Sequence, residues 1–588
     1  MTDSDWQEFP PHVLREYALL ADGERGALCG PRGDIGWLCA PGWDDEAVLS
    51  TLVGGGGMYS VSPVDAAVWG GYYEPGTLIW RNRWVTTDTT VECREALAFP
   101  GDPHRVVMLR RVDAVDRDVH VSVQLDLRDG FGRRGMRQSR RDQWGRWTAR
   151  TGRLRLRWSG AEEATVDSQG RLRLEFTLRA GAHRDLVLEI SDERLGRPVD
   201  PDTAWAETEN TWRAAVPGFE ACVAPRDARH AYAVMRGLTT RCGGMVAAAT
   251  LGLPERAESG RNYDYRYVWL RDQCYAGLAV GVNEPHPLLH DAVAFTTARV
   301  LEHGERLAPA YRTDGTPIPH ESTLRLPGYP GGSDVVGNWV DGQFQLDSLG
   351  EFLQLLATAA RYDQLDGDAR KAVDVAADVI ATRWQAPEAG IWELSDSWWT
   401  HSRLACVAGL RAIASHLPAR RGGELSGLAD AMLAETTSRC LSAEGFWQRS
   451  AELPGVDAAL LLPPVRGALT AADPRTRATL DAVRRDLVED GYIYRFAPDS
   501  RPLGHAEGAF LLCGFIMSLA TWHQGEQTEA FRWFERSRAA CGPPGLLAEE
   551  YDVRQRQLRG NLPQAFVHAL LLDCAQRLAT TPSETTAR

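Results

Sequence analysis

The period of the hydrophobic residues changes once along this chain, and that change constrains the fold more than any other feature. Up to about residue 190 apolar and polar residues alternate, as in VHVSVQLDL (119–127) and RLRLEFTL (171–178). Alternation of this kind is typical of strands that bury one face. From about residue 228 onward apolar residues recur every three or four positions, which predicts helices. We therefore expect a β part followed by an α part.

The β part is predicted to be an antiparallel sandwich. Glycine-bearing turns separate its strands, and no helix-length segment lies between them, which disfavours an α/β fold. The stretch 200–216 is predicted to form a linker helix that begins at an aspartate. These patterns predict three units: an N-terminal β-sandwich domain (1–195), a linker with a helix (196–227) and a helical domain (228–588).

About twelve helices are predicted in the second part. They fall near 228–250, 270–283, 286–303, 341–362, 368–385, 401–416, 424–440, 457–463, 474–489, 506–524, 527–541 and 563–579. Six consecutive helical hairpins can close into a ring, and every odd-to-even connection then emerges at the same end. The motif-like segments of the chain all fall on those connections, so we expect them to surround one pocket.

Two of these connections carry carboxyls that suit the cleavage of a glycosidic bond, which needs a proton donor and either a nucleophile or a base. Glu393 lies in AGIWELSDSWW, and burial among tryptophans would make it hold its proton. The segment GLLAEEYD offers Glu549 or Glu550 as the complementary base, and spacing favours Glu549 too weakly to decide between them.

Other residues on the connections can bind sugar hydroxyls or pack against a sugar ring. WLRD combines an aromatic face with a charged donor and a charged acceptor, although such a pair at a helix start also serves as a salt bridge or cap. YRFAPDS repeats the arginine–aspartate theme, and a tryptophan in GNWVD can wall a pocket or pack beneath it. These candidates are Trp269, Arg271, Asp272, Arg495, Asp499 and Trp339.

Charge and composition exclude several classes of protein. A formal net charge of −14 argues against nucleic acid or an anionic membrane as a partner. The odd count of 11 cysteines, without a CxxC pair, does not suggest a disulfide framework, and no apolar signal core or membrane span is visible. We therefore expect a cytoplasmic protein. Motifs for zinc, phosphate or dinucleotide sites are missing, so neither a cofactor nor a metal is expected, and WDDEAV (43–48) is interpreted as a solvated loop.

The sequence resembles the glucoamylase, glucodextranase and trehalase family of inverting glycoside hydrolases, known as glycoside hydrolase family 15. The resemblance covers nearly the whole chain. It is carried by GWLCAPGWDDEAVLSTL, FPGDPHRVVMLRRV, NYDYRYVWLRD, GNWVDGQFQLDSLGE, GIWE, THSRLACVAGLRAI, HAEGAFLLCGF and GLLAEEYD followed by GNLPQAFVHALLL.

The resemblance implies an N-terminal β-sandwich followed by an (α/α)6 barrel that carries the site. It implies Glu393 as general acid and Glu549 as the general base that activates water. In an inverting enzyme these carboxyls lie ~6.5–9.5 Å apart. The substrate-binding residues that it suggests are Arg271 and Asp272 for the non-reducing-end glucose, and Trp269, Trp392, Trp339, Arg495 and Glu550 around it.

The leading hypothesis is an exo-acting α-glucoside hydrolase that releases β-glucose from short isomalto- or malto-oligosaccharides. Trehalase is the nearest alternative. A sugar phosphorylase, which needs a phosphate site in place of the base, and a non-catalytic sugar-binding protein are alternatives of other classes. Leu394 and Trp339 depart from the family pattern on what we expect to be the aglycone side, so the linkage and the chain length stay open. The oligomeric state is also open.

Overall fold

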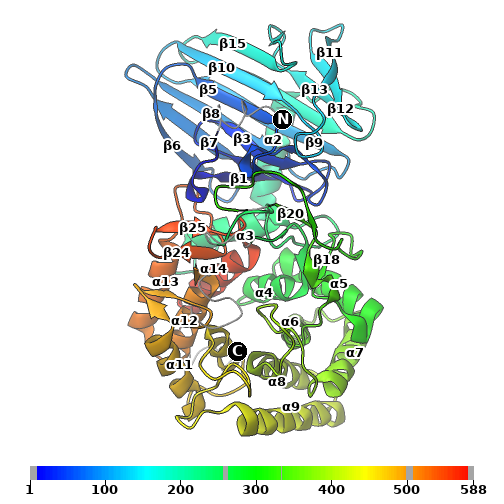
Figure 1. The fold of residues 1–588 in the computed structure, drawn as a ribbon, viewed down its shortest axis with the longest axis vertical. Helices are drawn as coiled ribbons and strands as arrows, with labels where there is room; N and C mark the ends of the chain where they lie inside the picture. The colour runs from blue at the N-terminus through cyan, green and yellow to red at the C-terminus, as the bar shows by residue number, and fades with distance from the viewer. Residues whose placement is uncertain (1–9, 256–261, 333, 498–507, 581–588) are drawn as a thin grey trace.

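The computed structural model describes residues 10–255, 262–332, 334–497 and 508–580. Two stacked β-sheets lie at one end of the molecule and a ring of helices at the other (Figure 1). The last strand of the sheets, β16 (His183–Ser191), is followed by helix α2 (Pro201–Ala215), which leads into the helical part. The change of hydrophobic period therefore does separate a β from an α part, and the predicted fold class is confirmed.

All pairings within the two large sheets are antiparallel. One sheet has the order β1-β2-β3-β5-β10-β15-β14, with β4 paired to β3, and the other has the order β11-β12-β13-β16-β9-β8-β7-β6. The strands are β1 (Ala18–Ala21), β2 (Gly26–Cys29), β3 (Asp34–Cys39), β4 (Ala47–Leu49), β5 (Met58–Pro63), β6 (Val68–Tyr73), β7 (Trp80–Val85), β8 (Thr90–Leu97), β9 (Arg105–Ala114), β10 (Val119–Asp126), β11 (Arg137–Arg141), β12 (Trp147–Thr151), β13 (Leu154–Ser159), β14 (Thr165–Val166), β15 (Leu172–Leu178) and β16.

The burial pattern of each strand shows which of its faces are covered. In β15 buried residues alternate with exposed ones, as expected for a strand with one face on the core. Strands β1 to β3 are buried at every position, because one face packs on the sandwich core and the other on the helical part. These short strands therefore carry no polar alternation, and they form the floor on which the helical ring sits.

Twelve of the helices form two concentric sets. The outer ones are α3 (Pro225–Leu238), α5 (Pro287–His303), α7 (Gly367–Arg383), α9 (Ala419–Cys440), α11 (Pro474–Asp486) and α13 (Gln527–Arg538). The inner ones are α4 (Leu270–Val280), α6 (Asp347–Arg361), α8 (Thr400–Ala414), α10 (Leu462–Val465), α12 (Leu511–His523) and α14 (Ala565–Arg577). Each inner helix packs on the next, and α14 packs back on α4, which closes the ring.

Sequence character decides which helix lies in which set. Helix α12, LLCGFIMSLATWH, is apolar nearly all round and almost fully buried, whereas α11 and α7 bury only one stripe. Two outer helices begin at aspartate caps, because the Asp366 carboxylate accepts from the N–H groups of Asp368 and Ala369, and Asp473 accepts from that of Arg475. The twelve predicted helices are therefore present, although α3 ends at Leu238 rather than near 250 and α10 is a single turn.

The sandwich is bound to the helical part through the connection between α3 and α4. Arg266, which is buried, donates to the backbone oxygens of Trp43 (3.2 Å) and Asp45 (2.8 Å) and pairs with Asp264. Asp44 forms an ion pair with Arg312 of the helical part. The interpretation of residues 43–48 as a solvated loop is therefore wrong: their backbone oxygens are the acceptors for a buried guanidinium.

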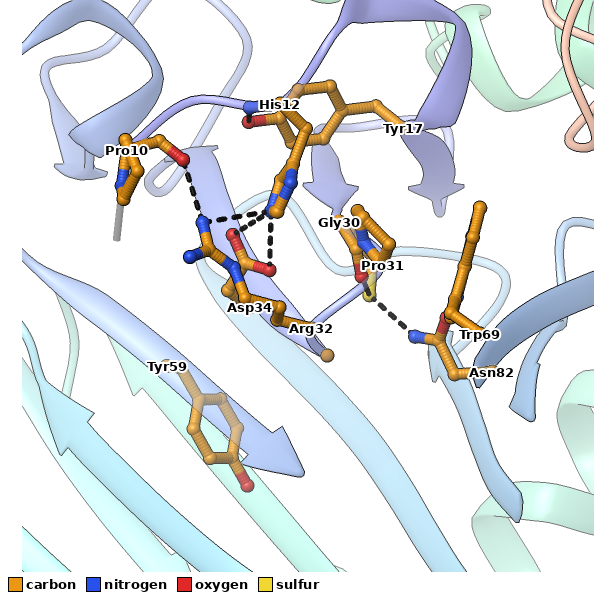
Figure 2. A network of polar contacts seen from close by, with 12 residues as sticks. Pro10, His12, Tyr17, Gly30, Pro31, Arg32, Asp34, Tyr59, Trp69 and Asn82 are labelled. Carbon is orange, nitrogen blue, oxygen red and sulfur yellow. Dashed lines mark hydrogen bonds and ion pairs between the residues drawn. The ribbon is translucent and has the colours of Figure 1, made fainter. Parts of the chain in front are cut away.

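The beginning of the described chain is held by a polar network at the edge of the sandwich (Figure 2). Figure 2 shows the His12 ring in contact with both Asp34 and Arg32. Its Nε2 lies 3.0 Å from the Asp34 carboxylate, and Arg32 donates to the Pro10 oxygen at 2.7 Å. The backbone oxygen of His12 accepts from the hydroxyl of Tyr329, 2.8 Å away in the helical part. The network thus fixes a segment that touches both parts.

All eleven cysteines are free thiols, in agreement with the prediction that they form no disulfide framework. Across the described residues, no helix combines the length and the apolar character that crossing a membrane requires.

Candidate active site

A pocket of about 540 Å³, including the space at its open mouth, lies at one end of the helical ring. Its walls come from five of the six odd-to-even connections, namely α3–α4, α5–α6, α7–α8, α11–α12 and α13–α14. The sixth, α9–α10, was also expected at the pocket but contributes no residue to this lining. The lining residues are Ala247, Glu255, Tyr263, Tyr265, Trp269, Arg271, Asp272, Trp339, Ile391, Trp392, Glu393, Arg495, Phe510, Glu549, Gln564 and Phe566. The two predicted carboxyls, Glu393 and Glu549, therefore face the same pocket.

Glu393 sits on a tight turn of the α7–α8 connection. Its backbone has a positive φ of 56°, and its N–H donates to the Gly390 oxygen at 3.1 Å. A positive φ is uncommon for a residue with a side chain. It turns the Glu393 side chain into a direction that a residue with a negative φ would not take at this position. Oε1 accepts from the indole N–H of Trp269 at 2.6 Å and lies 3.7 Å from Nη2 of Arg271.

Trp269, Arg271 and Asp272 line the floor of the pocket at the start of α4. The Arg271 guanidinium donates to Asp272 (3.2 Å) and to the backbone oxygen of Ile391 (2.7 Å), so it holds the Glu393 turn as well as its own partner. Burial raises the pKa of Asp272 to about 6, although the charge of Arg271 acts against this shift. This cluster presents both hydrogen-bond donors and acceptors to the cavity.

Glu549 lies across the pocket on the α13–α14 connection and is 4% exposed. Oε1 accepts from the hydroxyl of Tyr265 at 3.1 Å, whereas Oε2 accepts no hydrogen bond from the residues that the structure describes. Burial raises the pKa of Glu549 well above its usual value, and the charge of Glu255 raises it further, while Arg495 and Tyr265 act in the opposite direction.

The neighbouring carboxyl, Glu550, does not line the pocket. It is fully buried, and its oxygens accept from Nη2 of Arg495 (3.2 Å) and from the backbone N–H of Gly508 (2.8 Å). Of the two glutamates between which spacing could not choose, Glu549 faces the cavity, and Glu550 lies behind the wall as a partner of Arg495.

The predicted aromatic residues occupy different depths. The Trp392 indole is anchored by the Asp457 carboxylate at 2.9 Å and packs edge-on against Phe510. Trp339 is 39% exposed and forms part of the lining. Leu394, which we had placed on the aglycone side, is buried next to a smaller cavity and is not part of this lining.

Sequence reasoning missed several residues of the pocket, most of them on connections already singled out. Tyr263 and Tyr265 lie in RNYDYRYVWLRD, three and two alternations before Trp269, and their rings stack at 6.1 Å. Phe510, Gln564 and Phe566 lie within the quoted motifs HAEGAFLLCGF and GNLPQAFVHALLL, whereas Glu255 carries no local signal. Asp499 lies outside the described residues. No cluster of three or more metal-ligating side chains occurs in the described part of the chain.

Comparison with known proteins yields one consistent set of relatives. Residues 231–576 match the family described as Glycosyl hydrolases family 15, and residues 9–192 match that described as Trehalase-like, N-terminal. A trehalase of Mycobacterium tuberculosis is 27% identical over 96% of this chain and 89% of its own length. A trehalase of Mycolicibacterium smegmatis is 28% identical over 96% of this chain and 91% of its own length.

Among solved structures, a bacterial glucoamylase complexed with acarbose superposes with a TM-score of 0.71 and covers 98% of this chain and 96% of its own. At 13% identity this likeness concerns the fold. The (α/α)6 barrel preceded by a sandwich is therefore an architecture shared over the full length of both chains.

Proposed function

The chain belongs to Glycosyl hydrolases family 15 and is a glycoside hydrolase, and from this premise we propose that it cleaves trehalose to two molecules of glucose with inversion at the attacked carbon. The observation that carries the proposal is that Glu393 and Glu549, 156 positions apart in sequence, line the same pocket. Two carboxyls across one cavity suit an acid–base hydrolysis of a glycosidic bond.

Glu393 acts as the general acid in this proposal. Because the Trp269 N–H occupies Oε1 at 2.6 Å, the proton to be transferred resides on Oε2 and passes to the oxygen that joins the two sugars. The carboxylate left behind is stabilised by the same N–H and by Arg271 at 3.7 Å. The transfer cleaves the bond from the anomeric carbon to that oxygen and gives the leaving sugar its hydroxyl.

Glu549 acts as the general base. Its Oε2, which no described residue occupies, accepts a proton from water as the water attacks the anomeric carbon from the face opposite the leaving oxygen. Tyr265 holds Oε1 and so orients the carboxylate. The raised pKa that burial gives to Glu549 makes it a stronger proton acceptor once it is ionised.

Trehalose takes the place of the isomalto- and malto-oligosaccharides that the sequence analysis favoured. The reason is that two mycobacterial relatives named trehalase match 96% of this chain. Trp269, Arg271 and Asp272 on the pocket floor suit the sugar whose bond is broken, since they combine an aromatic face with charged donors and acceptors. The exposed Trp339 suits the ring of the second sugar.

Proton NMR during the first minutes of hydrolysis tests both the substrate and the stereochemistry. Inverting cleavage of trehalose releases one β-glucose from the attacked side and one α-glucose from the leaving side, so the two anomers should appear in equal amounts before they equilibrate. Two α-glucose molecules would indicate retention. Maltose and isomaltose serve as competitors, and faster glucose release from either would replace trehalose as the proposed substrate.

Two variants assign the roles. Glu393→Gln and Glu549→Gln should each lower kcat by roughly 10²–10⁴-fold, because each removes one proton-transfer partner. The exposed Glu424→Gln is the matched control and should leave kcat unchanged. An activity that survives in either pocket variant within a factor of about three would assign the chemistry to other residues.

A further inference from the structure

Besides Glu393, Asp272 and Glu549, a fourth carboxyl lines the pocket, and no role has been assigned to it above. Glu255 lies in the α3–α4 connection and is 3% exposed. Nη2 of Arg495 is 3.8 Å from Oε2 of Glu255 and 3.2 Å from Oε1 of Glu550. A buried carboxylate is costly unless a cation compensates it, so Arg495 is central to both glutamates.

The position of Arg495 is restricted from two sides. Its guanidinium lies 4.8 Å from the Phe510 ring and 5.4 Å from the Trp392 ring, and both rings belong to the pocket lining. Arg495 also acts electrostatically on Glu549, so at least three carboxyls of the described residues interact with this guanidinium. These carboxyls compete for its five N–H donors.

We propose that Glu255 is a positioning residue of the hydrolysis: by sharing Arg495 with Glu550, it prevents this guanidinium from pairing directly with Glu549 and so leaves Oε2 of Glu549 available to water. The inference rests on the proposed function, in which Glu549 is the base. In this arrangement Glu550 and Glu255 hold Arg495 in the wall of the pocket. Of the three glutamates, only Glu549 takes part in proton transfer.

Among the described residues, the groups that act most strongly on Glu549 come from three other connections. Tyr265 and Glu255 belong to the α3–α4 connection, Glu393 to α7–α8 and Arg495 to α11–α12, and Glu550 follows in the chain. After burial, Glu255 is the largest cause that raises the pKa of Glu549, and Arg495 is the largest that lowers it. Removal of Glu255 would thus act twice, since it deletes a negative charge that acts on Glu549 and takes away one of the carboxylates that hold Arg495, which keeps its contact with Glu550.

The first test is the pH dependence of kcat/KM for trehalose. In Glu255→Gln the acidic limb should move to lower pH by about one unit, because Glu549 then ionises more easily. The plateau of kcat should fall roughly tenfold, since the base is weaker and its oxygen is engaged by Arg495. KM should change less than about threefold, because the proposal assigns Glu255 no sugar contact.

Two variants accompany this test. Glu255→Asp keeps the charge and should retain the acidic limb of the wild type, whereas the exposed Glu424→Gln removes a charge elsewhere and should change nothing. An unmoved acidic limb in Glu255→Gln together with a tenfold higher KM would overturn the proposal and make Glu255 a ligand of the sugar.

A second readout does not need activity. The folded-state pKa of Glu549 is raised, so this group destabilises the fold as pH rises from its unfolded-state value, about 4.3, toward the folded-state value. Glu255→Gln should reduce this pH-dependent loss of stability, which is measured as the change of Tm with pH. In a Glu549→Gln background, Glu255→Gln should no longer change the slope of Tm against pH. The difference between its effects in the two backgrounds measures the coupling between Glu255 and Glu549.

The pH–rate profile and the dependence of Tm on pH test the proposed function and the role of Glu255 separately. A wild-type protein that does not hydrolyse trehalose contradicts the proposed function, whereas the stability cycle still decides on Glu255. Equal effects of Glu255→Gln on the pH dependence of Tm in both backgrounds would overturn the proposal whatever the substrate is.

Discussion

Tyr265 and Glu255 act on Glu549 in opposite directions, and this balance is the main electrostatic feature of the pocket at the scale of single residues. The phenolic O–H donates to Oε1 and favours the carboxylate, whereas the neighbouring negative charge and burial favour the protonated acid. From the sequence we expected burial among tryptophans to act on Glu393. In the structure Glu393 accepts a hydrogen bond from an indole N–H and lies near a guanidinium, and burial raises the pKa of Glu549.

Replacing Tyr265 by Phe provides a prediction with the opposite sign to that for Glu255. Loss of the donated hydrogen bond removes one cause that lowers the pKa of Glu549, so the acidic limb of kcat/KM should move to higher pH. The expected shift is about half a unit to one unit, with a roughly tenfold lower kcat. The measurement is the pH–rate profile.

Tyr263→Phe is the control for this prediction, because the Tyr263 ring stacks on that of Tyr265 and Tyr263 lies two residues before it in the chain. A shift of the acidic limb to lower pH in Tyr265→Phe, or an equal shift in Tyr263→Phe, would contradict the assigned hydrogen bond.

At the scale of elements, the turn that carries Glu393 depends on one glycine. Gly390 has a φ of 70°, and a Cβ at this position would meet the Trp399 ring at 2.7 Å. Gly390→Ala should therefore cost about 1–3 kcal/mol of stability and displace the Glu393 carboxyl. Because a displacement of about 1 Å can cost up to 10²-fold in rate, we expect kcat to fall at least tenfold.

Gly427→Ala is the matched control, since Gly427 lies in α9 with open space around it. Alanine there should raise stability by about 0.5–1 kcal/mol and leave kcat unchanged. Thermal unfolding and kcat on trehalose measure both effects. If Gly390→Ala keeps wild-type kcat, the turn does not position Glu393 as described.

The helices themselves could be predicted because their burial follows from period and composition. Strong apolar periodicity in α6, α8 and α14 sufficed to locate them within a few residues. The end of α3 could not be predicted, because 246–251 is apolar enough for a helix but pairs instead with distant backbone, Ala248 with Gln564 and Leu251 with Asp264. A tertiary partner here overrides local propensity.

At the scale of the whole molecule, the sandwich is part of the support of the active site. Arg266, one residue after Tyr265 and three before Trp269, is held by backbone oxygens of 43–45, and the Trp37 indole donates to the Ala249 oxygen at 2.8 Å. Strands β1 to β3 bury their second face on the helical part. We therefore propose that the three units inferred from the sequence form one cooperative body.

A shortened chain of residues 200–588 tests this proposal. It would expose the apolar surface that the helical part now buries against β1 to β3, and it would leave Arg266 paired with Asp264 but without its backbone acceptors at Trp43 and Asp45. We expect aggregation, or a loss of cooperative unfolding, and no hydrolysis of trehalose. Size-exclusion chromatography and calorimetry are the measurements. A monodisperse fragment that unfolds cooperatively within a few degrees of the full chain would show that the helical ring folds alone.

Much of this protein is determined by local sequence. The change of period at about 190–228 separates strands from helices, because the side chains of a strand and of a helix repeat with different periods. The order of hairpins then puts alternate connections at one end, which brings Glu393 and Glu549 to one pocket. Fold class, element order and the rim of the site follow from these rules.

Only the tertiary structure decided which atoms act on which. That Glu549 rather than Glu550 faces the cavity, that Glu255 shares Arg495, and that residues 43–45 support the α3–α4 connection all depend on contacts between segments far apart in the chain. Electrostatic effects on a buried carboxyl are set by distances of a few ångströms, and periodicity in sequence contains no information about them. The chemistry of the pocket is therefore decided by packing.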